Sequence, residues 1–320
     1  MSASEATCEM APQFIPDEAE WVRSHYHDVP LETLEFCGDI SGKTVLNLGC
    51  GELLTDFGLL GLNVKQILGL DLDEKSPDHL DTVAKRLQQH GIQPARDYRT
   101  RIAYQCYGGE KFPFDDSQFD FVFSWSAFEH VLNVPAVLSE IHRVLRDDGR
   151  AFIQVYPWYH SFAGSHLSDY IPDPYFHLTR TSDWVRDRLR DYAAQRPDKA
   201  SWVQEVMYPA YLTLNRYSAN RFYRDVMAAG FRVVKATLIS SDLDLSDAPP
   251  NVDLSDLMIC GTKMLLEKAD SPRRTPPKVH PRVSYNGQID EIHRSLSWRI
   301  TAPLRFAGGL FLRVTGRSRK

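Results

Sequence analysis

Cysteine is scarce in this 320-residue chain, which has only five: Cys8, Cys37, Cys50, Cys106 and Cys260. They are odd in number, widely spaced and form no CxxC pair, so the sequence predicts neither a disulfide framework nor a zinc cluster. This pattern fits a reducing cytoplasm best.

Long apolar runs are also missing. The longest run near the end of the chain, 302–314, is interrupted by Arg305 and Arg313 and is shorter than the ~20 residues that cross a bilayer. The first twenty residues are acidic and lack an apolar core segment, so we expect no secretory signal. We therefore expect a cytoplasmic protein without a transmembrane helix.

Basic residues are few in most of the chain and are concentrated at its end. Residues 268–320 hold twelve Lys or Arg against three acidic residues, a balance of +9, which leaves −14 for residues 1–267. The contrast between an acidic body and a basic tail is a clue to the partners or surfaces that the protein binds, and it carries no information about the fold. Nucleic acid is not an expected partner, because the acidic body would repel phosphates.

Strand-like and helix-like segments alternate along residues 38–267. Short apolar runs rich in branched residues predict strands, and stretches of helical spacing between them predict helices. The strands are expected at 44–49, 66–72, 102–107, 119–126, 150–157, 231–239 and 257–267, and the clearest helices at 77–91, 136–149 and 219–229. Such alternation is typical of an α/β fold with a doubly wound, mainly parallel sheet.

The remaining segments suggest a domain organisation. Residues 1–37 form an N-terminal helical segment before the main domain at 38–267, and residues 158–218, dense in aromatics and histidine, interrupt its rhythm as a lid insertion. The Pro-rich, basic stretch 268–288 reads as a linker, and 289–320 as a basic amphipathic tail. The aromatic residues of the insertion either contact substrate or form the core of a helical subdomain.

A glycine turn follows the first predicted strand, at Gly49-Cys50-Gly51. Missing β-carbons there let a ligand approach the backbone and the N-terminus of the next helix. Asp71 ends the second strand twenty residues after Gly51, where a carboxylate can accept hydrogen bonds from ribose hydroxyls. Leu54 stands where a dinucleotide-binding turn has its third glycine, so a nucleoside ligand without a pyrophosphate fits better.

With GGEKFPFDDSQFDFVFSWSAFEHV and LSEIHRVLRDDGRAFIQVYP, these motifs resemble the class I S-adenosylmethionine-dependent methyltransferases of the small-molecule type. The similarity covers residues 38–157 and 219–267. It implies a Rossmann-like seven-stranded sheet whose last strand is antiparallel, with S-adenosylmethionine as cofactor. It implies cofactor contacts from Asn47, Gly49, Cys50, Gly51, Asp71, Leu72, Gly109, Glu110, Ser124 and Trp125. The family has Asp where Asn47 stands and Asp where Gly108 stands.

Three histidines are the candidate bases. His166 and His177 lie in the insertion, and His130 follows the fourth strand at a position that is often His in the family that the sequence resembles. An imidazole with a pKa near ~6.5 can accept a proton at neutral pH. The alternative for each of the three candidate bases is a structural role, in hydrogen bonding or packing. No metal site is predicted from His160, His166 and His177, because no cysteine or fixed short spacing supports one.

The tail carries a second resemblance. The string SLSWRITAPLR is similar to a segment of bacterial glycosyltransferases and neighbouring proteins of surface-polysaccharide assembly. It implies a glycan acceptor, and a glycosyltransferase complex or the inner face of the plasma membrane as the docking site of the tail. The alternative is an ordinary solvated tail.

Together these features predict a methyltransferase that modifies a sugar hydroxyl or carboxylate in bacterial surface-polysaccharide biosynthesis. The alternatives are methylation of another small metabolite and a catalytically silent docking protein.

Overall fold

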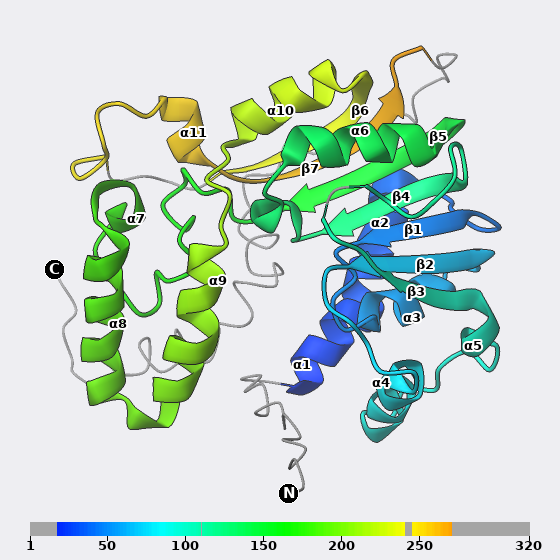
Figure 1. Cartoon of the computed structure of the whole chain (residues 1–320), viewed down its shortest axis with the longest axis horizontal. Helices are drawn as coiled ribbons and strands as arrows, with labels where there is room; N and C mark the ends of the chain where they lie inside the picture. The colour runs from blue at the N-terminus through cyan, green and yellow to red at the C-terminus, as the bar shows by residue number, and fades with distance from the viewer. Residues whose placement is uncertain (1–17, 110, 241–244, 271–320) are drawn as a thin grey trace, which may run out of the picture.

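A single mixed sheet organises the protein. The computed structural model describes residues 18–109, 111–240 and 245–270. In these ranges seven strands are ordered β3-β2-β1-β4-β5-β7-β6 (Figure 1). The strands are β1 (Thr44–Leu48), β2 (Gln66–Asp71), β3 (Ile102–Cys106), β4 (Phe119–Trp125), β5 (Leu145–Val155), β6 (Phe231–Ser240) and β7 (Ile259–Lys268). The first five are parallel to one another and β7 pairs antiparallel with both β5 and β6, which confirms the predicted sheet.

Helices cover both faces of the sheet, so its central strands are apolar on both sides. On one face, Val137 of α6 (Val134–Val144) and Phe222 of α10 (Ala219–Ala228) share a core with Leu46 of β1. On the other, Phe57 of α3 (Leu54–Leu60) packs in a core with Val45. That second core also holds residues of α1 (Glu18–Arg23), α2 (Val29–Cys37), α4 (His79–Gln89) and α5 (Tyr98–Arg101), so the N-terminal helices pack in the same core as α3 (Figure 1).

The junction between α6 and β5 differs from the prediction. We expected a helix to Gly149 and a strand from residue 150, but α6 ends at Val144 and β5 begins at Leu145. Leu145 is fully buried and pairs with Phe119 of β4, so burial of this leucine draws the chain into the sheet early. Gly149 lies inside the strand, where a β-carbon would come 2.8 Å from the Leu145 side chain.

The insertion builds a core of its own. Its helices are α7 (Phe176–Thr179), α8 (Ser182–Gln195), η3 (Pro197–Lys199), η4 (Trp202–Met207) and α9 (Tyr208–Leu212), and they stand beside the sheet (Figure 1). Tyr159, Tyr170 and Tyr211 are buried in this core. Most aromatic residues of the insertion therefore form the core of this subdomain, which is the second of the two alternatives that the sequence left open.

Both ends of the insertion are fixed to the main domain. At its start, the backbone N–H of Trp158 donates to the carbonyl of Cys260 (2.7 Å) and its indole N–H donates to Thr262 (3.1 Å). At its end, the Asn215 side-chain amide donates to the carbonyls of Phe128 (2.6 Å) and Val131 (2.8 Å).

No helix within the described ranges is long and apolar enough to cross a membrane. The predicted linker beyond Asp270, the basic tail at 289–320 and Glu110 lie outside the described residues.

Candidate functional site

The glycine turn after β1 takes the shape that the sequence predicts. Gly49 and Gly51 both have left-handed backbones, with φ of 73° and 49°. A β-carbon on Gly49 would lie only 2.3 Å from the β-carbon of Ala127, whereas one on Gly51 would meet nothing within 4 Å. Gly49 is thus required by the contact between two loops, and Gly51 leaves open space at the carboxyl end of the sheet.

The carboxylate of Asp71 closes this turn from the neighbouring strand. It accepts the backbone N–H of Gly51 (2.8 Å) with one oxygen and that of Leu72 (2.7 Å) with the other. The two bonds fix both oxygens beside the glycine turn, where each keeps a lone pair for a ligand hydroxyl. The Leu72 side chain is 60% exposed, and a β-carbon on Gly109 would lie 3.5 Å from it. The predicted ribose and adenine contacts therefore lie side by side.

A cavity opens above the glycine turn. Its walls come from β1, from the end of β4 and from the N-terminal helices, and the lining residues are Trp21, His25, Asn47, Gly49, Cys50, Gly51, Glu52, Leu54, Thr55, Phe123, Trp125 and Ser126. His25 belongs to η1 (Ser24–Asp28), and burial lowers its pKa to about 4. It is therefore neutral at pH 7, and the N-terminal helices give the cavity a wall without a fixed charge.

A buried amide–carboxyl pair lies under the cavity. The Asn47 side-chain amide donates to Oδ2 of Asp56 (2.7 Å), and Asp56 is fully buried. Oδ1 of Asp56 has no hydrogen-bond partner among the described residues, and burial raises the pKa of Asp56 to about 8. Where the resemblance implies an acid on β1, this chain has an amide, and its carboxyl lies in the first turn of α3.

Of the two cofactor contacts predicted at the end of β4, Trp125 lines the cavity and Ser124 does not. Ser124 is fully buried, and its hydroxyl donates to the Leu48 carbonyl (3.0 Å), so it joins two strands. The next two residues, Trp125 and Ser126, face the cavity. The Trp125 indole nitrogen is buried without a hydrogen-bond partner among the described residues.

The residues of this site fit S-adenosylmethionine. Asp71 offers carboxylate oxygens to ribose hydroxyls, the exposed Leu72 offers an apolar surface to an adenine ring, and Gly51 leaves room for the cofactor along the backbone. The Trp125 indole nitrogen supplies a donor that needs an acceptor.

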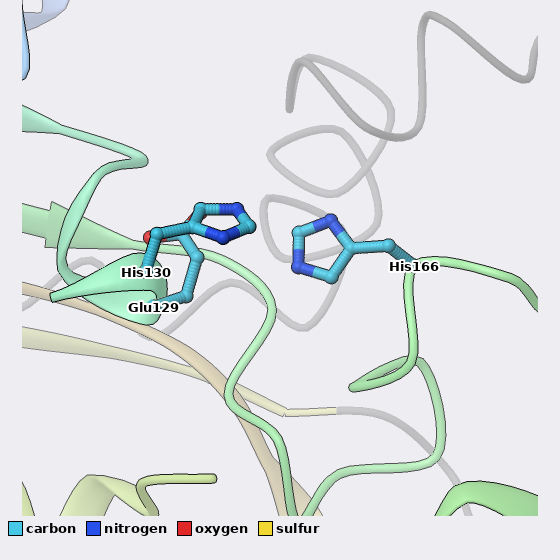
Figure 2. Close-up of side chains that lie close together, drawn as sticks. All are labelled: Glu129, His130 and His166. Carbon is cyan, nitrogen blue, oxygen red and sulfur yellow. The ribbon is translucent and has the colours of Figure 1, made fainter. Parts of the chain in front are cut away.

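A second cluster joins the segment after β4 to the insertion. Glu129 and His130, both of η2 (Phe128–His130), come close to His166 of the insertion, and one nitrogen or oxygen from each residue lies within 4.8 Å of the other two. The imidazoles of His130 and His166 point toward one another, with the Glu129 carboxyl beside His130 (Figure 2). The structure therefore brings together two of the three predicted bases.

Burial keeps this cluster uncharged at neutral pH. It raises the pKa of Glu129 to about 8 and lowers that of His130. Burial, with smaller contributions from His130 and His177, lowers the pKa of His166 to about 3. A neutral imidazole has a lone pair for a proton or a metal ion.

His177, the third predicted base, is hydrogen-bonded to the backbone of the insertion. Its Nε2 lies 2.8 Å from the carbonyl of Tyr159 and must carry the proton, because a carbonyl only accepts. The residue is 4% exposed, and burial lowers its pKa to about 4.

Sequence reasoning missed several of these residues. Trp21 and His25 reach the cavity through packing of distant segments, and no motif marks them. Glu129 stands next to His130 in FEHV, and its acidic character inside an apolar stretch was a usable signal.

Replacing Gly49 by Ala tests the close contact of the turn. We expect Gly49→Ala to lower the free energy of unfolding by about 3 kcal/mol, because the new methyl group overlaps Ala127 and the backbone is left-handed. Gly42→Ala is the matched control, since Gly42 has a similar φ of 69° with nothing within 4 Å and should cost about 1 kcal/mol. Urea denaturation measures both, and equal losses would contradict the contact.

Comparison with known proteins finds similarity to methyltransferases. Residues 46–153 match the family model described as "Methyltransferase domain". Phosphoethanolamine N-methyltransferase 2 of Caenorhabditis elegans is 25% identical over 41% of the chain and 28% of its own length. The 2-phytyl-1,4-naphtoquinone methyltransferase of Nostoc punctiforme is 30% identical over 42% of the chain and 56% of its own length. The chain thus spans about half or less of the length of these relatives.

Among solved structures, an S-adenosylmethionine-dependent methyltransferase of Mesorhizobium loti is similar over 80% of this chain and all of its own. The identity is 15% and the TM-score 0.45.

The sheet order, the glycine turn with Asp71 and the family match show that residues 46–153 are similar to a methyltransferase domain. S-adenosylmethionine is the cofactor of this class, as the sequence predicts.

Proposed function

We propose that the protein transfers the methyl group of S-adenosylmethionine to an oxygen atom of a small acceptor bound between the sheet and the insertion. The observation that carries the proposal is the Asp71 carboxylate, which accepts the backbone N–H groups of Leu72 and of Gly51, a residue that lines the cavity. When bound, the cofactor supplies a methyl group on a sulfonium, which is transferred by in-line displacement, so the protein mainly aligns the two reactants.

The neutral cluster of Glu129, His130 and His166 supports an oxygen acceptor. A hydroxyl must lose its proton as it accepts a methyl group, and a nearby imidazole lone pair can receive that proton. His130 follows Ser126, which lines the cavity, by four residues in the chain. His177 remains a predicted base with a weaker claim, because its Nε2 is already bonded to the Tyr159 carbonyl.

For the acceptor we propose a hydroxyl or carboxylate of a sugar in bacterial surface-polysaccharide biosynthesis. Support comes from the tail string SLSWRITAPLR and its resemblance to proteins of polysaccharide assembly. We propose that this tail docks the enzyme to a glycosyltransferase complex or to the inner face of the plasma membrane.

Titration calorimetry and a transfer assay test the proposal in two steps. The full chain should bind S-adenosylmethionine with micromolar affinity, and absence of binding at millimolar cofactor would overturn every enzymatic assignment. Methyl-labelled cofactor should then label nucleotide sugars or lipid-linked glycans. Deleting residues 271–320 should abolish membrane or complex association, and association that survives the deletion would contradict the role of the tail.

Another small metabolite is the alternative acceptor. The two relatives described above are named for phosphoethanolamine and a naphthoquinone, which are not sugars. Labelling of such compounds without labelling of any sugar would overturn the sugar assignment and leave the methyltransferase assignment intact.

A further inference from the structure

We propose that Glu129, His130 and His166 bind a divalent transition-metal ion of the zinc type at the junction of the main domain and the insertion. The three residues offer two imidazoles and one carboxylate, with their ligand atoms within 4.8 Å of one another. Ligands of a tetrahedral zinc ion lie ~3.4 Å apart at bond lengths near ~2.1 Å, so small side-chain rotations close the site. Two imidazoles favour zinc-type ions over Mg²⁺ or Ca²⁺.

Two of the proposed ligand atoms are buried without partners. Oε2 of Glu129 and Nε2 of His166 are both inaccessible to solvent and have no hydrogen-bond partner in the part of the chain that the structure describes. A buried polar atom without a partner costs about 1–3 kcal/mol, so a ligand that satisfies both atoms would recover this energy. A cation bound at the cluster contacts both at once.

The third ligand is oriented by a hydrogen-bond chain. The Thr213 hydroxyl donates to the Ala210 carbonyl (2.8 Å), and its oxygen lies 2.8 Å from Nδ1 of His130. Because the only proton of this hydroxyl is already used, Nδ1 of His130 must be the donor, and Nε2 of His130 keeps its lone pair for a metal. Metal-binding histidines commonly donate their second ring nitrogen in this way.

The backbone around the cluster is also fixed. Asn215 holds η2 through the carbonyls of Phe128 and Val131, and its own N–H donates to the carbonyl of Glu129 (2.9 Å). His166 has a left-handed backbone with φ of 59°, an unfavourable conformation that its surroundings maintain. Three protein ligands leave one coordination position open, which is typical of catalytic zinc sites.

The open coordination position gives the ion a role in acceptor binding. There it would hold an oxygen of the acceptor and lower the pKa of its hydroxyl, and it would replace the imidazole base, because metal binding uses the lone pairs of His130 and His166. This role depends on the proposed methyl transfer, whereas metal binding itself does not.

Co²⁺ titration of the tag-free full chain, followed by visible absorption, tests the site. We expect one Co²⁺ per chain with the absorption of a low-coordinate site, and stoichiometric displacement by Zn²⁺. His166→Ala and Glu129→Gln should each weaken binding by more than ~100-fold, and His160→Gln, another histidine of the insertion, should leave it unchanged.

Binding of S-adenosylhomocysteine to the same variants separates this proposal from the proposed function. Unchanged affinity for S-adenosylhomocysteine shows that the variants are folded. If His166→Ala unfolds, the nearly isosteric Glu129→Gln still tests the metal site. Absence of Co²⁺ binding at millimolar metal, or equal binding by all variants, would overturn the metal site whether or not the cofactor binds. Loss of cofactor binding by the unaltered protein would instead overturn the proposed function.

Discussion

Asp71→Ala should lower the affinity for S-adenosylmethionine by ~100-fold or more. The substitution removes the carboxylate that is predicted to accept the ribose hydroxyls and also leaves the N–H groups of Gly51 and Leu72 without their acceptor. Hydrogen bonds to a charged group contribute about 1.5–3 kcal/mol each, and 1.4 kcal/mol corresponds to a tenfold change in affinity. Titration calorimetry with the cofactor and with S-adenosylhomocysteine measures the loss.

The control for this substitution is two residues further along the same loop. Asp73 is exposed and is not part of the glycine turn, so Asp73→Ala removes a similar charge without removing the contacts. Equal affinity of Asp71→Ala and the unaltered protein would remove Asp71 from the ribose site. A similar loss of affinity in Asp71→Ala and Asp73→Ala would show that the effect comes from the change in net charge and not from the contacts of Asp71.

Asp56→Asn should stabilise the protein at pH 8. The folded pKa of Asp56 is about 8 against the ordinary value of 3.8, because burial disfavours the carboxylate. Between these values the unfolded chain is ionised while the folded chain still holds the proton. Stability contributed by this group is therefore complete below pH 3.8 and falls by about 1.4 kcal/mol per pH unit until pH 8. An asparagine does not ionise and can still accept from Asn47, so the variant lacks this loss.

Urea denaturation at pH 5 and pH 8 measures the difference. The variant should gain a few kcal/mol relative to the unaltered protein between these pH values. Glu129, whose pKa is also raised to about 8, contributes a slope of the same sign that stays in both proteins. Asp73→Asn is the exposed control and should show no gain, and parallel pH profiles for Asp56→Asn and the unaltered protein would contradict a neutral Asp56.

The sheet was predictable because its signal is local. Each strand is a short run of buried apolar residues, and burial on both faces makes such runs continuous in the sequence. The end of α6 was not predictable in this way, since the pairing of Leu145 with Phe119 depends on a neighbouring strand rather than on the Gly149 that reads as a helix stop.

The site was predictable only where one motif contains it. Gly49, Gly51 and Asp71 lie at the ends of adjacent strands, so their spacing indicates their contact. The pairing of His130 with His166 depends on how the insertion folds back over η2, and the pairing of Asn47 with Asp56 depends on the direction of α3. Neither of these two pairings produces a pattern in the sequence, although each of the residues could be recognised as polar or titratable.

The two attachments of the insertion limit how an acceptor can enter. Trp158 is bonded to β7 and Asn215 is bonded to the turn after β4, so neither end is a free hinge. Opening by rigid rotation would break both sets of bonds, whereas rearrangement of the helices between them would break neither. If the acceptor enters through the middle of the insertion, amide exchange should be slow at the two attachment points and faster in α8.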